Sequence, residues 1–109
     1  MFKVEKVIDG NTIVVNPNWN FANTTGNEII VRGYVPMFSK EVSKKWNDAD
    51  ENKIANKLAK KRLEFLLIDK FVELKIRPTE TGDCIDNGKM RCRVYLNDVD
   101  ISKYFPDFN

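Results

Sequence analysis

The first fifteen residues carry the pattern of a β-hairpin. Apolar and polar residues alternate along residues 2–8, with Val7 as the exception, and such alternation is typical of a half-buried strand. Residues 9–11 (Asp-Gly-Asn) form a turn signal, and residues 12–15 are β-branched throughout. The pattern therefore predicts two antiparallel strands joined by a tight turn.

Polar and turn-forming residues dominate the next segment. Residues 17–26 are rich in Asn and Thr and predict a loop, although Trp19 and Phe21 are unusual there. Either Trp19 or Phe21 is expected to plug the edge of a β-barrel, or to form an exposed platform on which a base stacks. A third strand is expected over residues 28–35, ended by Pro36, and residues 37–47 are expected to form a loop.

A long helix follows. Apolar residues recur at spacings of three and four over residues 48–68, and Asp48 and Asp50 suit the start of a helix. Further strands are expected over residues 71–76 and 90–96, with a loop at 77–88 between them. The residues expected to share one face of the last strand are Met90, Cys92, Val94 and Leu96. A turn at 97–98 and a short helix over 100–105 complete the chain.

Five strands with a helix between the third and the fourth predict an oligonucleotide-binding (OB) topology. The fold class expected is thus α+β, mainly β: a five-stranded OB-fold barrel with one long helix and a short C-terminal helix. A length of 109 residues predicts a single domain over residues 1–109.

Composition narrows the chemistry. The 18 basic and 16 acidic residues nearly balance, so the net charge of +2 favours no partner class by itself. The absence of histidine makes zinc improbable and leaves oxygen ligands for any metal. Cys84 and Cys92 are expected to be reduced thiols. We see neither a signal peptide nor a membrane span and expect a cytoplasmic protein. High Asn and Lys usage suggests a phage or low-GC bacterial source.

Several segments resemble domains of the staphylococcal nuclease family. Residues 7–15 (Val-Ile-Asp-Gly-Asn-Thr-Ile-Val-Val) are similar to the family's opening hairpin, which reads V-x-D-G-D-T before β-branched residues. Residues 30–35 are similar to its third strand, which carries an arginine. Matches to the helix, the fourth strand, the Y-G-R segment and the fifth strand fall on residues 55–58, 66–67, 70–74, 87–89 and 94–101. The resemblance implies a barrel of the staphylococcal nuclease type, whose active members are calcium-dependent phosphodiesterases acting on DNA and RNA.

The resemblance also implies a degenerate metal site. The hairpin aspartate that binds calcium corresponds to Asn11, while Asp9 matches the first aspartate of the hairpin. The family's I-D-x-P-E-like run falls on residues 36–41, which puts Pro36 or Met37 in place of the second calcium aspartate. Calcium takes six to eight oxygen ligands, so Asp9 and Asn11 should not hold it usefully. We expect catalysis to be weak or absent and no cofactor to be bound, with calcium the candidate if the site is functional.

Three residues fall on catalytic positions of the family. Arg32 matches the arginine of strand three, and Lys89 replaces the second arginine, where it cannot fork onto two phosphate oxygens. The glutamate that positions water corresponds to Lys40, or to Glu41 if the loop has one extra residue. If the loop aligns with the family's motif in a shifted register, one of three acidic residues would serve as a metal ligand: Glu41, Asp48 or Asp50.

Basic residues suggest a surface for single-stranded DNA or RNA. Single-stranded nucleic acid suits a surface in which cations follow the phosphate backbone and aromatic rings stack on bases. The residues expected to form it are Arg32, Lys89, Arg91, Arg93 and Tyr95, with Tyr34 nearby. The alternative is that Arg91, Arg93 and Tyr95 are ordinary exterior residues that cover the long helix.

Three functions therefore remain open. The first is a nuclease-like nucleic-acid-binding domain with little or no catalysis, acting as an accessory or competitor of nucleases. The second is an active metal-dependent phosphodiesterase with a rebuilt site. The third is a protein-interaction module, since the same barrel serves as a scaffold in larger assemblies. Its exposed apolar patch would consist of Trp19, Phe21, Met37, Phe38 and Trp46.

Overall fold

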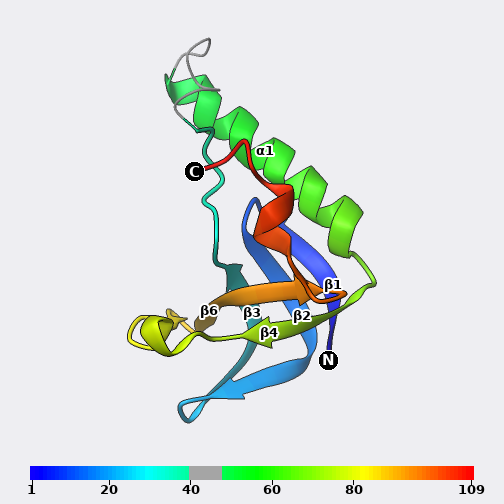
Figure 1. The fold of residues 1–109 in the computed structure, drawn as a ribbon, viewed down its shortest axis with the longest axis vertical. Coiled ribbons are helices and arrows are strands. Elements are labelled where there is room, and N and C mark those ends of the chain that lie inside the picture. Colours follow the sequence, from blue (N-terminus) through cyan, green and yellow to red (C-terminus); the bar gives the residue numbers. More distant parts are fainter. Residues whose placement is uncertain (40–47) are drawn as a thin grey trace.

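In the computed structural model, which describes residues 1–39 and 48–109, five strands close into a β-barrel (Figure 1). The barrel order is β3-β2-β1-β4-β6, and β6 returns to β3. All neighbouring barrel strands are antiparallel except β3 and β6, which are parallel. The barrel strands are β1 (Phe2–Asp9), β2 (Thr12–Phe21), β3 (Thr24–Val31), β4 (Phe71–Lys75) and β6 (Lys89–Leu96).

The remaining elements lie between and after these strands. Helix α1 (Asp48–Leu67) connects β3 to β4, and the 3-10 helix η3 (Ile101–Tyr104) follows the last barrel strand. The short elements are η2 (Pro78–Glu80), β5 (Ile85–Asp86) and β7 (Val99–Asp100). The prediction of a mainly-β, OB-like barrel with a helix between its third and fourth strands is confirmed. In the described part of the chain, no helix combines the length and apolar composition needed to cross a bilayer.

Irregular pairing in β1 explains why Val7 breaks the alternation. The register between β1 and β2 shifts between Val4 and Lys6 and again between Val7 and Asp9. A bulge of this kind adds a residue to one strand and re-aims the side chains that follow. As a result Val4 and Val7 are both buried in the barrel, although they are three residues apart.

The predicted loop at residues 17–26 is wrong, because β2 and β3 continue through it. Trp19 pairs with Gly26, and the strands reverse at Ala22 and Asn23, which both have positive φ. Pro17 lies beyond the last β1–β2 pair, at Asn16, so its missing N–H costs no bond of that ladder. This hairpin extends away from the barrel on the side opposite the N-terminal end of α1 (Figure 1).

The third strand is also displaced from its predicted position. It ends at Val31 and not at Val35, and the chain then turns away from the barrel at Gly33, with φ of 110°. A Cβ at Gly33 would lie 2.5 Å from the Cβ of Ser102, so a side chain is excluded there on both counts.

The segment after Gly33 pairs with the C-terminal tail, which the sequence did not predict. Phe38 forms a bridge with Phe108, and the backbone N–H of Val35 donates to the carbonyl of Asn109. In Figure 1 the red C-terminal segment accordingly runs beside the cyan segment that leaves β3.

An aromatic cluster holds this tail in place. Tyr34 stacks on Phe105 with ring centroids 4.1 Å apart, and Phe108 packs against both rings and against Phe38. Arg62 of α1 covers Phe105 and Phe108 and binds the carboxylate of Asp107 with two hydrogen bonds. The tail is therefore fixed by apolar contact on one side and by a forked ion pair on the other.

Helix α1 packs on β1 through one stripe of side chains. The fully buried residues recur every four positions, at Ala55, Ala59, Leu63 and Leu67. Phe65 points away from the barrel and is 88% exposed.

We expect Leu63→Ala to lower the free energy of unfolding by about 2–5 kcal/mol, because it removes buried methyl groups and leaves a cavity. The matched control Phe65→Ala removes a larger side chain from the same helix, and we expect it to change stability by about 0.5 kcal/mol or less. Urea denaturation followed by circular dichroism measures both. Equal losses for the two variants would contradict the packing described here.

Candidate nucleic-acid interface

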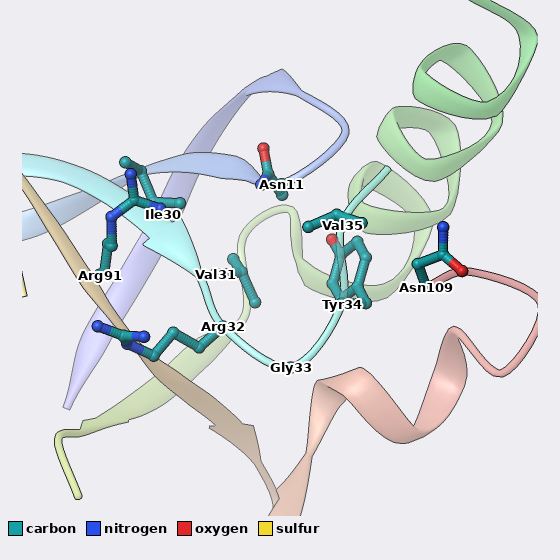
Figure 2. Close-up of a pocket in the computed structure, with 9 residues that line it drawn as sticks. All are labelled: Asn11, Ile30, Val31, Arg32, Gly33, Tyr34, Val35, Arg91 and Asn109. Carbon is teal, nitrogen blue, oxygen red and sulfur yellow. The ribbon is translucent and has the colours of Figure 1, made fainter. Parts of the chain in front are cut away.

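A pocket of about 290 Å³ opens where β3 leaves the barrel beside β6 (Figure 2). Its lining includes Asn11, Ile30, Arg32, Tyr34, Arg91 and Asn109. Figure 2 shows the guanidinium groups of Arg32 and Arg91 on one side of this pocket, with Asn109 on the other side. Two of the residues expected to bind nucleic acid, Arg32 and Arg91, therefore lie together with Asn11 of the predicted metal pair.

The parallel pairing of β3 and β6 brings the two arginines to one pocket. Ile30 lies opposite Arg91 in this register, and the backbone N–H of Arg32 donates to the carbonyl of Cys92 at 2.9 Å. Residues of β6 alternate between the two faces, so Met90, Cys92 and Val94 are buried while Arg91 faces outward. The predicted inward face of this strand is confirmed for these three residues; Leu96 is half-buried.

The turn between β1 and β2 is fixed against α1 and against Tyr34. The N–H of Gly10 donates to the side-chain oxygen of Asn56 at 3.1 Å, and the Tyr34 hydroxyl donates to the carbonyl of Gly10 at 2.7 Å. A Cβ at Gly10 would lie 2.6 Å from the Cβ of Pro36. These contacts hold Asn11 at the rim of the pocket.

The loop of residues 77–88, here called the acidic loop, supplies a carboxylate to each nearby arginine. Asp83 pairs with Arg32 and Asp86 pairs with Arg91. Arg32 also donates to the backbone carbonyl of Glu80 at 3.3 Å. In the described part of the chain, the buried Nε of Arg32 has no hydrogen-bond partner. The acidic loop thus balances the charge of both arginines, which the sequence analysis did not foresee.

Among the described residues, Arg93 pairs with two carboxylates, whereas Arg32 and Arg91 each pair with one. Its partners are Glu80 at 3.1 Å and Asp100 at 3.5 Å. The Arg93 guanidinium lowers the pKa of Glu80 below its usual value. Asp100 also caps η3 by accepting a hydrogen bond from the N–H of Ser102. Arg93 therefore joins the acidic loop, β6 and η3, and its guanidinium is engaged by carboxylates of two elements.

Lys89 and Tyr95 lie away from the pocket lining. Lys89 begins β6 and pairs with Asp86 across the β5–β6 hairpin, and no ion pair is found for it within residues 1–39 and 48–109. The ring of Tyr95 is covered by the ammonium group of Lys75, 4.3 Å from its centroid. The expectation that Arg91, Arg93 and Tyr95 cover the long helix is wrong, because α1 packs on β1.

The expectation that Trp19 or Phe21 plugs the barrel is confirmed for Trp19, and the alternative of an exposed stacking platform is wrong for this ring. Trp19 is 1% exposed, and its indole N–H donates to the carbonyl of Glu28. Tyr34 is buried against Phe105. Neither ring is available to stack on a base.

The apolar patch expected for a protein partner is not formed as predicted. Trp19 and Phe38 are buried and Phe21 is half-buried, whereas Met37 is exposed. Trp46 lies outside the described residues. Among the residues whose burial the structure describes, the exposed phenylalanines are Phe65 and Phe71, which belong to other elements.

The described residues do not fit a calcium site. Asp9 contributes a carboxylate, but one of its oxygens accepts the backbone N–H of Asn11 at 3.1 Å. Val35, Pro36 and Met37 follow Tyr34 where a second carboxylate would be needed. Within residues 1–39 and 48–109, no three acidic or thiol side chains are grouped as metal ligands would be. Glu41 lies outside the described residues, and so do the side chains of Asp48 and Asp50.

The fold and the pocket define a closed, five-stranded, OB-like barrel with two arginines at the rim. Comparison with known proteins adds no relative: no family model, no curated protein and no solved structure matches the chain.

Replacing the Tyr34 hydroxyl should loosen the turn that carries Asn11. We expect Tyr34→Phe to lower the free energy of unfolding by about 1 kcal/mol at pH 8, because the carbonyl of Gly10 loses its donor. Urea denaturation measures this loss, and an unchanged stability would contradict the role given to the hydroxyl.

The same pair of proteins should differ in pH dependence. Burial raises the pKa of Tyr34 above its usual value of 10.0, with a further rise from the charge of Asp9. As the pH rises above 10, the unfolded chain loses the proton while the folded chain retains it, so the wild type loses stability. We expect the advantage of the wild type over Tyr34→Phe to shrink by about 1.4 kcal/mol per pH unit above 10. Parallel stability curves from pH 8 to 11 would contradict this.

Proposed function

We propose that this chain is a nuclease-like OB barrel of the staphylococcal nuclease type that binds single-stranded nucleic acid without hydrolysing it. The observation that carries the proposal is the placement of Arg32 and Arg91 in one pocket with Asn11. OB folds bind oligonucleotides with the strand 2–3 face and with the loops that join strands 1–2 and 4–5. In this barrel the corresponding connections are the turn at 9–11 and the acidic loop, and both adjoin the pocket.

Contacts to phosphate, and not to bases, are the basis of the proposed binding. Arg32 and Arg91 present guanidinium groups, which match phosphate oxygens in a forked geometry. The aromatic rings near the pocket are buried, as shown by Tyr34, so they offer no stacking surface. We therefore propose binding that is independent of sequence, that tolerates DNA and RNA alike and that weakens steeply with salt.

The lack of a suitable donor set supports binding in place of cleavage. Hydrolysis of this kind needs a metal that polarises the phosphate and activates water. Asn11 removes one charge from the set that calcium prefers, and Pro36 and Met37 offer no carboxylate. A protein with these properties would shield single strands or compete with active nucleases for them.

We expect binding of a labelled oligothymidylate to the wild type at low salt, with an affinity that falls linearly in a log–log plot against salt. Arg32→Gln/Arg91→Gln should weaken binding by about tenfold or more and reduce the slope by about 1.4, since two phosphate contacts are lost. Fluorescence anisotropy across a salt series measures both quantities.

The matched control is Lys53→Gln/Lys57→Gln, which removes the same charge from the exposed face of α1. We expect it to leave the affinity within about twofold. A control that weakens binding as much as the arginine variant would show non-specific attraction only. A wild type that does not bind at low salt would remove the proposed function.

We expect the purified protein to leave single-stranded DNA intact in the presence of calcium, because the described carboxylates cannot hold the ion. Incubation with a labelled oligonucleotide, with and without a chelator, measures this on a gel. Cleavage that stops when the chelator is added would instead establish a rebuilt active site, and Glu41→Gln would then test the residue expected to position water.

A further inference from the structure

The two pocket arginines are already engaged by anions that belong to the chain itself. Asp83 and Asp86 are both in the acidic loop, three residues apart, and each pairs with one arginine of the pocket. Their side chains are 73% and 49% exposed, so they can turn into solvent without unburying the core. Neither carboxylate is needed to complete the barrel.

The acidic loop is anchored independently of these two residues. Glu80 is only 18% exposed and is bound by Arg93, and the N–H of Arg91 donates to the carbonyl of Cys84 at 2.6 Å. The Cys84 thiol in turn donates to the carbonyl of Thr81 at 3.1 Å. The backbone of the acidic loop therefore stays beside the pocket when Asp83 and Asp86 move.

We propose that Asp83 and Asp86 act as resident competitors of phosphate for Arg32 and Arg91, so that the acidic loop restrains nucleic-acid binding at this pocket. The inference rests on the proposed function, because it assigns regulation to the same pocket. A ligand of this pocket must then replace both carboxylates at once, so we expect it to be a polyanion.

Tethering explains why the restraint is effective. A group held next to its partner by a short segment acts at an effective concentration in the millimolar range or above. A ligand that meets each arginine singly competes poorly with such a group. A chain with several phosphates gains the second contact within the same molecule, so it can replace both carboxylates. The Arg32 guanidinium also lowers the pKa of Asp83 below its usual value, as expected for a carboxylate that accepts a hydrogen bond from a guanidinium.

The test replaces the two carboxylates and keeps their shape. We expect Asp83→Asn/Asp86→Asn to bind the labelled oligothymidylate about threefold to thirtyfold more tightly than an isocharge control, and to show a steeper salt slope. The control is Glu5→Gln/Glu64→Gln, which removes two exposed carboxylates on β1 and α1. Each single replacement, Asp83→Asn or Asp86→Asn, should tighten binding by a smaller factor.

A double-mutant cycle isolates the effect. In the Arg32→Gln/Arg91→Gln background, the two asparagine replacements should give no tightening beyond the isocharge control, because the carboxylates then have no arginine to occupy. Equal affinities for Asp83→Asn/Asp86→Asn and the control in the wild-type background overturn the inference, and so does tightening that persists without the arginines.

The outcomes also separate the inference from the proposed function. If the wild type binds and loss of the arginines weakens it, but loss of the carboxylates changes nothing, the function stands and the restraint is absent. If only Asp83→Asn/Asp86→Asn binds, the wild type does not perform the proposed function, and the restraint is complete. If no protein in the set binds at low salt, both are overturned.

Discussion

The parallel pairing of β3 with β6 is the interaction on which the pocket depends. It joins two strands that are separated in sequence by α1 and β4, and it closes the barrel. The same register sets Ile30 beside Arg91 and places the N–H of Arg32 on the carbonyl of Cys92. Because the pairing is lost one residue later, at Gly33, Arg32 remains at the rim while the chain leaves toward the C-terminal tail. The position of the two arginines is thus a direct consequence of closure.

Closure of the barrel also determines which charged side chains lie close together. The acidic loop connects β4 to β6 and includes β5, so it lies beside the outer face of β6, where Arg91 and Arg93 project. Arg93 is fixed by Glu80 and Asp100 and serves as an anchor, whereas each pocket arginine pairs with one exposed carboxylate. Ion pairs with an exposed partner contribute about 0–1 kcal/mol, so these carboxylates can be exchanged, while a half-buried network is costly to disturb. A single loop therefore combines a fixed attachment with carboxylates that can be displaced.

The sequence predicted those features that rest on local periodicity. The helix was predicted to within one residue, because its apolar spacing persists over about four turns, and β6 was predicted by the strict alternation from Met90 to Leu96. The β2–β3 extension was missed because its exposed faces are polar and its turn uses Ala22, which rarely takes positive φ. The pairing of Phe38 with Phe108 was missed because it joins distant segments. The ion pairs of Arg32 and Arg91 arise from a loop without periodicity.

Attraction of a phosphate and hydrolysis of a phosphodiester bond need different groups. The arginines alone attract a phosphate in its ground state and in its transition state alike, and such uniform binding does not accelerate a reaction. Acceleration needs groups that act only as the bond breaks, such as a metal-bound water. Asp9 uses one carboxylate oxygen to hold the turn through the N–H of Asn11, so it serves local structure. The described residues thus bring two arginines to the rim of the pocket, each paired with a carboxylate of the acidic loop, and show no cluster of three or more side chains that could hold a metal ion.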